Sequence, residues 1–162
     1  MSRRLYCLSV MQQFFDEARA GSTRSNCAKQ KLGAALVKDG KVLSVGWNSC
    51  ACGGYSRSQE ISAEKCERMA LPTGQGYERS RPVHAEVAAL LNIRPERSAA
   101  DFERCISTVE PTEELVSSLF TPEERTLLQG AVLYLSGHTY ACDSCQKWAR
   151  LLGITSILFA GD

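Results

Sequence analysis

The stretch KLGAALVKDGKVLSVGWN, residues 31–48, decides the fold. Residues 32–38 and 42–47 are rich in small and β-branched apolar side chains, which is typical of short strands. Asp39 and Gly40 stand between these two runs, and an Asp-Gly pair flanked by apolar segments is a strong signal for a two-residue hairpin. The stretch therefore predicts a pair of antiparallel strands.

Helices and further strands are expected on both sides of this hairpin. Residues 5–19 carry apolar side chains at close to helical spacing, which predicts an amphipathic helix before it. The elements expected after it are a helix opened by Pro82 and ended before Pro95, a strand over 131–136, a helix over 142–152 ended by Gly153, and a strand over 154–159. This order predicts an α/β fold in which helices pack against one mixed sheet.

Two segments do not fit this alternation. Residues 49–81 contain glycines, many polar groups and three cysteines, and predict a long loop with a short helix near 63–69. Residues 98–130 predict an insertion with one or two short helices, because 112–114 and 121–124 both resemble helix starts. A chain of 162 residues suits one domain with a single core, so residues 1–162 are expected to form one domain.

Composition excludes several classes of function. The 19 basic and 18 acidic residues give a net charge of +1, which offers no bulk attraction for long nucleic acid. No apolar run is long enough to span a bilayer, and polar residues at 12–17 come too early for a secretory signal. We expect a cytoplasmic protein, in which eight cysteines indicate metal binding or catalysis rather than disulfides.

Two short motifs carry the expected chemistry. One is His84-Ala85-Glu86 at a predicted helix start, and the other is Cys142-Asp143-Ser144-Cys145 at a predicted strand-to-helix junction. One histidine and two cysteines suit a catalytic zinc, which keeps its fourth position open for water. Cys142 and Cys145 share a helix face, and a helix start favours the thiolate form that metal binding requires.

Glu86 is the candidate proton carrier beside this zinc. Zinc lowers the pKa of a bound water from 15.7 to about 7, which makes a nucleophile available at neutral pH. Glu86 would take a proton from the water, protonate a ring nitrogen of the substrate and later protonate the departing amine.

The two motifs together resemble the signature of the cytidine and deoxycytidylate deaminase superfamily. The stretch 31–48 is similar to the first hairpin of deoxycytidylate deaminases, and the resemblance extends over roughly residues 9–160. It implies a three-layer cytidine-deaminase-like fold with helices on both faces of the sheet, and a homo-oligomer. It also implies these site residues: His84, Cys142 and Cys145 as ligands of Zn²⁺, Glu86 as the catalytic residue and Asn48 as a substrate contact.

The activity implied is hydrolytic deamination of a small cytosine nucleotide, with dCMP to dUMP plus ammonia as the leading form. The sequence departs from the family pattern at Ala141, where proline is usual before the first cysteine, and at Ala88, where deoxycytidylate deaminases often have asparagine. The same chemistry on another substrate stays open, namely adenosine in tRNA, guanine, or cytosine in single-stranded DNA. A non-catalytic, zinc-stabilised nucleotide-binding domain is a further alternative.

Other residues have two interpretations each. Cys52, Cys66 or His138 could close the zinc site as a fourth ligand, and Cys50, Cys52 and Cys66 could hold a second zinc or be free loop thiols. His138 could line the pocket or simply end a strand. Arg24 and Lys29 could meet a phosphate or be ordinary loop residues. Cys7, Cys27 and Cys105 are expected to be small buried side chains.

Overall fold

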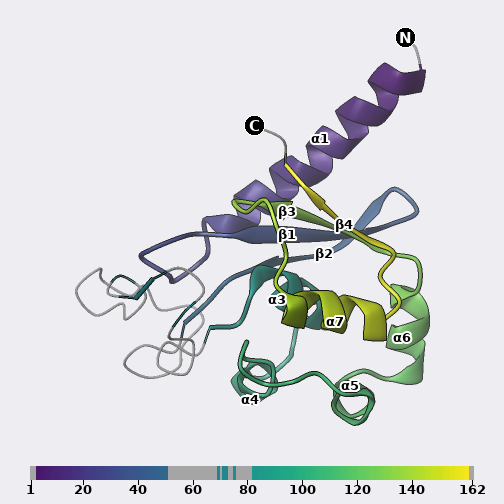
Figure 1. The fold of residues 1–162 in the computed structure, drawn as a ribbon. Helices are drawn as coiled ribbons and strands as arrows, with labels where there is room; N and C mark the ends of the chain where they lie inside the picture. Colours follow the sequence, from purple (N-terminus) through teal and green to yellow (C-terminus); the bar gives the residue numbers. More distant parts are fainter. Residues whose placement is uncertain (1–2, 51–68, 70, 73–74, 76–81, 161–162) are drawn as a thin grey trace.

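The computed structural model describes residues 3–50, 69, 71–72, 75 and 82–160. Its centre is a four-stranded sheet in the order β2-β1-β3-β4 (Figure 1). β1 pairs antiparallel with both β2 and β3, and β3 pairs parallel with β4, so the sheet is mixed as predicted. The strands are β1 (Gly33–Lys38), β2 (Lys41–Trp47), β3 (Val132–Ser136) and β4 (Ser156–Phe159).

The predicted hairpin joins β1 to β2. Lys38 pairs with Lys41, and the two residues between them have positive φ angles, 51° at Asp39 and 74° at Gly40. Two residues with positive φ in a two-residue loop are the mark of a type I′ turn, whose twist matches that of the strands. The predicted two-residue hairpin turn at Asp39 and Gly40 is therefore confirmed.

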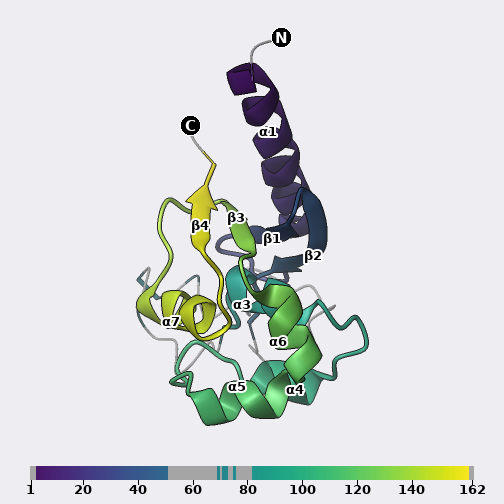
Figure 2. The same ribbon diagram turned by 90° about the vertical axis from the view of Figure 1, so that its right-hand side faces the viewer.

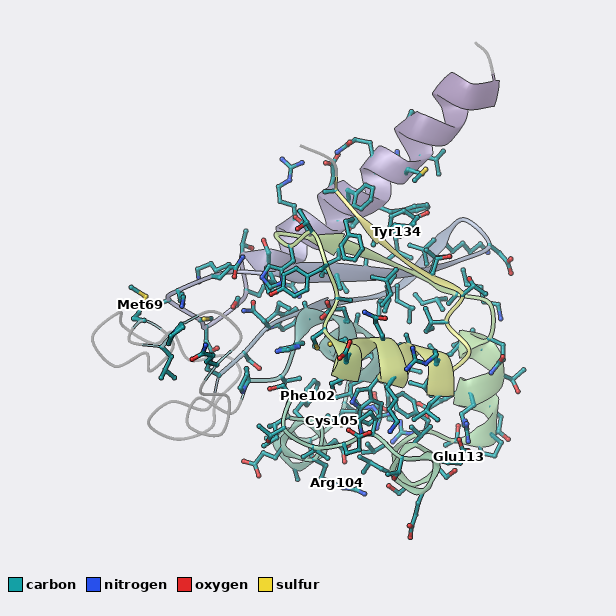
Figure 3. The ribbon with its side chains drawn as sticks, in the orientation of Figure 1. Met69, Phe102, Arg104, Cys105, Glu113 and Tyr134 are labelled. Carbon is teal, nitrogen blue, oxygen red and sulfur yellow. The ribbon has the colours of Figure 1, made fainter. Side chains whose placement is uncertain are left out.

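Helix α1 (Arg3–Ser22) covers one face of the sheet (Figures 1 and 2). Its side chains Phe14, Phe15 and Ala18 form a small apolar cluster with strand residues that include Tyr134. The ring centroids of Phe14 and Phe15 lie 5.0 and 5.1 Å from that of Tyr134, which Figure 3 shows on the α1 side of the sheet. No helix in the described part of the chain has the length and apolar character that crossing a membrane requires.

Two short helices, α3 (Ala85–Leu91) and α7 (Asp143–Leu151), cover the opposite face. Every residue of α3 is buried, and the main core lies between these helices and the sheet. Helices therefore lie on both faces of a mixed sheet, which confirms the expected three-layer fold class.

Helix α3 lies unusually close to strand β2. A β-carbon on Gly46 would come within 2.1 Å of the Ala89 backbone nitrogen and 2.5 Å of the Ala85 carbonyl oxygen. Only glycine permits this approach of two backbones. Two side chains also tie strand and helix, since Ser44 donates to the Ala89 carbonyl and Asn92 donates to the Val45 carbonyl at 2.8 Å.

The segment 98–130 forms three short helices where one or two were expected (Figure 2). Each begins at a hydroxyl side chain that accepts a hydrogen bond from a backbone N–H three residues later, and Thr121 forms a full capping box with Glu124. The helices are α4 (Ala99–Glu103), α5 (Glu113–Leu119) and α6 (Pro122–Leu128), with Ser98, Thr112 and Thr121 as their caps.

The expectation that Pro82 opens a helix is wrong. Helix α3 begins at Ala85, because the backbone of the preceding residues is engaged elsewhere. Val83 forms a two-bond bridge with Ser49, at 2.9 and 3.0 Å, and the Pro82 carbonyl accepts from the Ser107 N–H at 2.8 Å. The helix expected near 63–69 falls outside the described residues except for Met69, as does most of the long loop over 49–81.

Because Gly46 sets the distance between β2 and α3, we expect Gly46→Ala to lower the free energy of unfolding by about 2–4 kcal/mol. Val42→Ala, at an exposed position of the same strand, should cost less than about 1 kcal/mol. Urea unfolding followed by circular dichroism measures both. If Gly46→Ala and the wild type unfold at the same urea concentration, the close approach of β2 and α3 at Gly46 is contradicted.

Candidate metal centre

Two motifs far apart in the sequence meet where α3 and α7 begin. His84 is the N-cap of α3 and Cys142 is the N-cap of α7. The His84 Nδ1 atom lies 3.3 Å from the Sγ of Cys142 and 3.3 Å from the Sγ of Cys145. The three ligand atoms all lie within 4.8 Å of one another. The three residues predicted to bind metal are therefore brought together.

The donor set and its spacing fit zinc. Ligand atoms of a tetrahedral zinc with one nitrogen and two thiolates lie about 3.6 Å apart, close to the separations in this cluster. Within the described ranges, the group that could hold a metal contains these three residues, and His138 is not among them. A set of three ligands leaves the fourth tetrahedral position open for a reacting molecule. Cys52 and Cys66 lie outside the described residues.

The backbone at the two helix caps aims the ligands. His84 and Cys142 both have extended conformations, with φ and ψ of −75° and 155° and of −68° and 162°. An extended cap turns its side chain over the end of the helix rather than along its side. This is why His84 can share a pocket with Glu86 although the two are only two residues apart.

Glu86 lies at the edge of the cluster and is only 4% exposed. Its Oε2 atom accepts from the Cys145 Sγ at 3.4 Å. Burial raises the pKa of the Glu86 carboxyl, and the nearby charge of His84 opposes that rise. A buried carboxyl at this position can exchange protons with a molecule held at the cluster.

The two cysteines hold their protons differently. The hydrogen bond from Cys145 lowers the pKa of the Cys142 thiol to about 4, against the effect of burial. The same contact, together with burial, raises the pKa of Cys145 well above its usual value. The Cys142 Sγ also accepts from the Cys145 backbone N–H at 3.4 Å, so the first helical turn of α7 stabilises a thiolate at Cys142.

Asn48 is buried and holds the chain that leads into β1. Its Oδ1 accepts from the Leu32 N–H at 2.8 Å, and its Nδ2 donates to the Gln30 carbonyl at 2.8 Å. These bonds leave one hydrogen of the Asn48 amide for another partner. The role of Asn48 as a substrate contact stays a prediction.

The two basic candidates, Arg24 and Lys29, have partners within the protein. The Arg24 guanidinium lies 5.3 Å from the centre of the Trp47 ring, and Lys29 donates to the Leu71 carbonyl. Cys27 and Cys105 are buried as expected, and burial raises the pKa of Cys105 to about 12. Cys50 is also buried. The side chain of Cys7 lies outside the described part of the chain.

The Gln30 side chain makes two polar contacts that no sequence pattern predicts. The Gln30 side chain bonds to the Gly137 carbonyl at 3.1 Å and to the His138 Nε2 at 3.0 Å. The His138 ring stacks with Tyr140, with centroids 5.0 Å apart and planes inclined by 14°. Neither Gln30 nor Tyr140 belongs to a recognisable motif. Their roles become visible only through these contacts with the loop at Gly137 and His138.

Comparison with known proteins agrees with this geometry. The family model of the cytidine and deoxycytidylate deaminase zinc-binding region matches residues 8–161. The deoxycytidylate deaminase of Enterobacteria phage T4 is 24% identical over 143 residues, which cover 85% of this chain and 70% of the phage protein.

Solved structures of the dCMP deaminase from cyanophage S-TIM5 share the fold. The apo form has a TM-score of 0.50 at 19% identity and covers 98% of this chain and 84% of that one. The form in complex with dCMP and dUMP has the same TM-score and identity and covers 98% and 82%. The likeness supports the three-layer architecture.

If the cluster binds zinc, Cys142→Ser should purify with far less metal than the wild type and unfold at a lower temperature, because metal binding and folding are coupled. Elemental analysis after gel filtration measures the zinc content. Cys105→Ala, which removes a buried thiol outside the cluster, should keep its zinc. Full zinc content in Cys142→Ser would remove this residue from the ligand set.

Proposed function

Because the chain belongs to the cytidine and deoxycytidylate deaminase family, we propose that it hydrolyses the exocyclic amine of a cytosine nucleotide and converts dCMP and water to dUMP and ammonia. One observation carries this proposal. The buried carboxyl of Glu86 lies at the edge of a cluster of one imidazole and two thiols, at the converging ends of two helices.

The residues that would hold zinc are His84, through Nδ1, and Cys142 and Cys145, through their sulfur atoms. The spacing of these donors fits the ion. Zinc bound there would supply an activated water at neutral pH by lowering its pKa from 15.7 to about 7.

Glu86 would move the protons of the reaction. Its carboxylate takes a proton from the attacking water and gives it to the ring nitrogen beside the reacting carbon. The second proton of the water follows the same route to the amine. The carbon–nitrogen bond then breaks, ammonia leaves, and the base becomes uracil. Because Glu86 is 4% exposed, bulk water competes little for these protons.

Two observations favour a small cytosine nucleotide as the substrate. The phage T4 relative is a deoxycytidylate deaminase, and the cyanophage S-TIM5 enzyme has been solved with dCMP and dUMP. The net charge of +1 gives little attraction for a polynucleotide. Asn48 would contact the nucleotide through the amide hydrogen that its own loop leaves free.

The remaining expectations concern the chain as a whole. We propose that residues 1–162 act as one deaminase domain, in a cytoplasmic homo-oligomer. Light scattering of the zinc-loaded protein after gel filtration measures the assembly, and a monomer at all concentrations would contradict it.

A panel of substrates tests the base and the phosphate. The zinc-loaded protein should release ammonia from dCMP, and its kcat/KM for dCMP should exceed that for deoxycytidine by about tenfold or more, since a contact to a charged group contributes about 1.5–3 kcal/mol. Adenine and guanine nucleotides and a short single-stranded DNA complete the panel. Faster release from another base would keep the chemistry and change the substrate. If no compound of the panel releases ammonia, the alternative of a non-catalytic, zinc-stabilised nucleotide-binding domain is favoured.

Replacing the proton carrier tests the mechanism. Glu86→Gln should lower kcat for dCMP by roughly 10²–10⁴-fold while zinc content and melting temperature stay close to those of the wild type. Glu96→Gln, an exposed glutamate ten residues further on, is the matched control and should leave kcat unchanged. A fully active Glu86→Gln protein would remove Glu86 from the mechanism.

A further inference from the structure

The loop between β3 and α7 carries an aromatic pair beside the metal-binding cluster. It begins at Gly137 and ends at Cys142, so it connects the end of the sheet to the first ligand of α7 (Figure 1). His138 and Tyr140 stack within it, and Tyr140 is 50% exposed although it lies only two residues from Cys142. Solvent therefore reaches the Tyr140 ring, and the His138 ring lies stacked against it.

The Gln30 amide fixes the orientation of the His138 ring. The Gly137 carbonyl can only accept a hydrogen bond, so the Gln30 Nε2 must face it, at 3.1 Å. The Gln30 Oε1 then faces the His138 Nε2, at 3.0 Å, and can only accept. The hydrogen of the neutral imidazole therefore lies on Nε2, and Nδ1 carries a lone pair.

The position of Gln30 is itself fixed. Its backbone carbonyl accepts from the buried Asn48 amide at 2.8 Å, and the Asn48 Oδ1 holds the Leu32 N–H two residues later. Asn48, Gln30 and His138 thus form a continuous polar chain from the end of β2 to the loop before Cys142. In the described part of the chain, no residue bonds to the His138 Nδ1.

A nucleotide offers only certain groups to such an acceptor. Outside the base, phosphate oxygens accept hydrogen bonds, whereas the hydroxyl groups of the sugar donate them. A neutral imidazole nitrogen with a lone pair therefore suits a sugar hydroxyl and has no charge with which to attract a phosphate.

We infer that His138 is a specificity-determining residue, whose Nδ1 accepts a hydrogen bond from the sugar hydroxyl of the nucleotide, and that Gln30 is its positioning residue. The inference rests on the proposed function, since it concerns the part of that substrate outside the base. Tyr140 supports the His138 ring by stacking on one of its faces.

The test compares dCMP with 2′,3′-dideoxycytidine monophosphate, which lacks the sugar hydroxyl. Steady-state kinetics at pH 8, where imidazole is neutral, are measured on the zinc-loaded full chain. The wild type should prefer dCMP by roughly tenfold in kcat/KM, as expected for one hydrogen bond to a half-buried acceptor. His138→Ala and Gln30→Ala should each raise KM for dCMP by about that factor, leave kcat within about threefold, and lose the preference.

Three controls separate positioning from a loss of structure. The double variant Gln30→Ala/His138→Ala should raise KM no further than His138→Ala alone, because Gln30 acts through His138. Gln13→Ala, at an exposed position of α1, is the matched control for Gln30→Ala and should behave as the wild type. Zinc content and melting temperature should be unchanged in all variants.

Several outcomes would overturn the inference: equal use of the two nucleotides by the wild type, an unchanged KM in His138→Ala, or additive effects in the double variant. If the wild type releases no ammonia from either nucleotide, the proposed function fails, and calorimetry with dUMP takes over as the readout. Tighter binding of dUMP than of its dideoxy analogue, lost in both single variants, would still support the inference. No binding, or no difference, would reject it as well.

Discussion

The close contact of helix α3 with strand β2 at Gly46 is the constraint on which the rest of the structure depends. Because no side chain separates the two backbones, the axis of the helix and the position of its first turn are fixed relative to the sheet. His84 and Glu86 stand at that first turn. Their partners come from α7, the crossover helix between the parallel strands β3 and β4, which has Cys142 as its N-cap and Cys145 in its first turn.

The chemistry of the cluster follows from burial as much as from ligand identity. Two thiols, an imidazole and a carboxyl lie together in a region that the core largely shields from water. In such surroundings a negative charge is costly unless a hydrogen-bond donor or a cation stands beside it. The first turn of α7 stabilises the thiolate of Cys142, whereas the pKa of Cys145 is raised by its hydrogen bond to Cys142 and by burial, and the pKa of Glu86 is raised by burial. A divalent cation bound at the cluster would stabilise the negatively charged forms of Cys142, Cys145 and Glu86 together.

Features decided within a few residues could be predicted from the sequence, and features decided by distant contacts could not. The Asp-Gly turn and the caps at Thr112 and Thr121 act over at most three residues, and all three formed as expected. The helix start predicted at Pro82 was wrong because the neighbouring Val83 pairs with Ser49, and local sequence patterns do not reveal that contact. The metal-binding cluster could be foreseen because its spacing is chemically distinctive. Gln30 could not, since its partners lie more than a hundred residues away.

Arg97 links the short helices of residues 98–130 to the end of helix α3. Its side chain is 1% exposed, its guanidinium lies 4.7 Å from the centre of the Phe120 ring, and its Nε donates to the Leu91 carbonyl at the end of α3. A seven-residue helix is too short to persist alone and is maintained by what surrounds it. Residues 98–130 are thus joined to the core: excising them would leave the buried guanidinium of Arg97 without Asp101 and Glu124, and α3 without support at its carboxyl end.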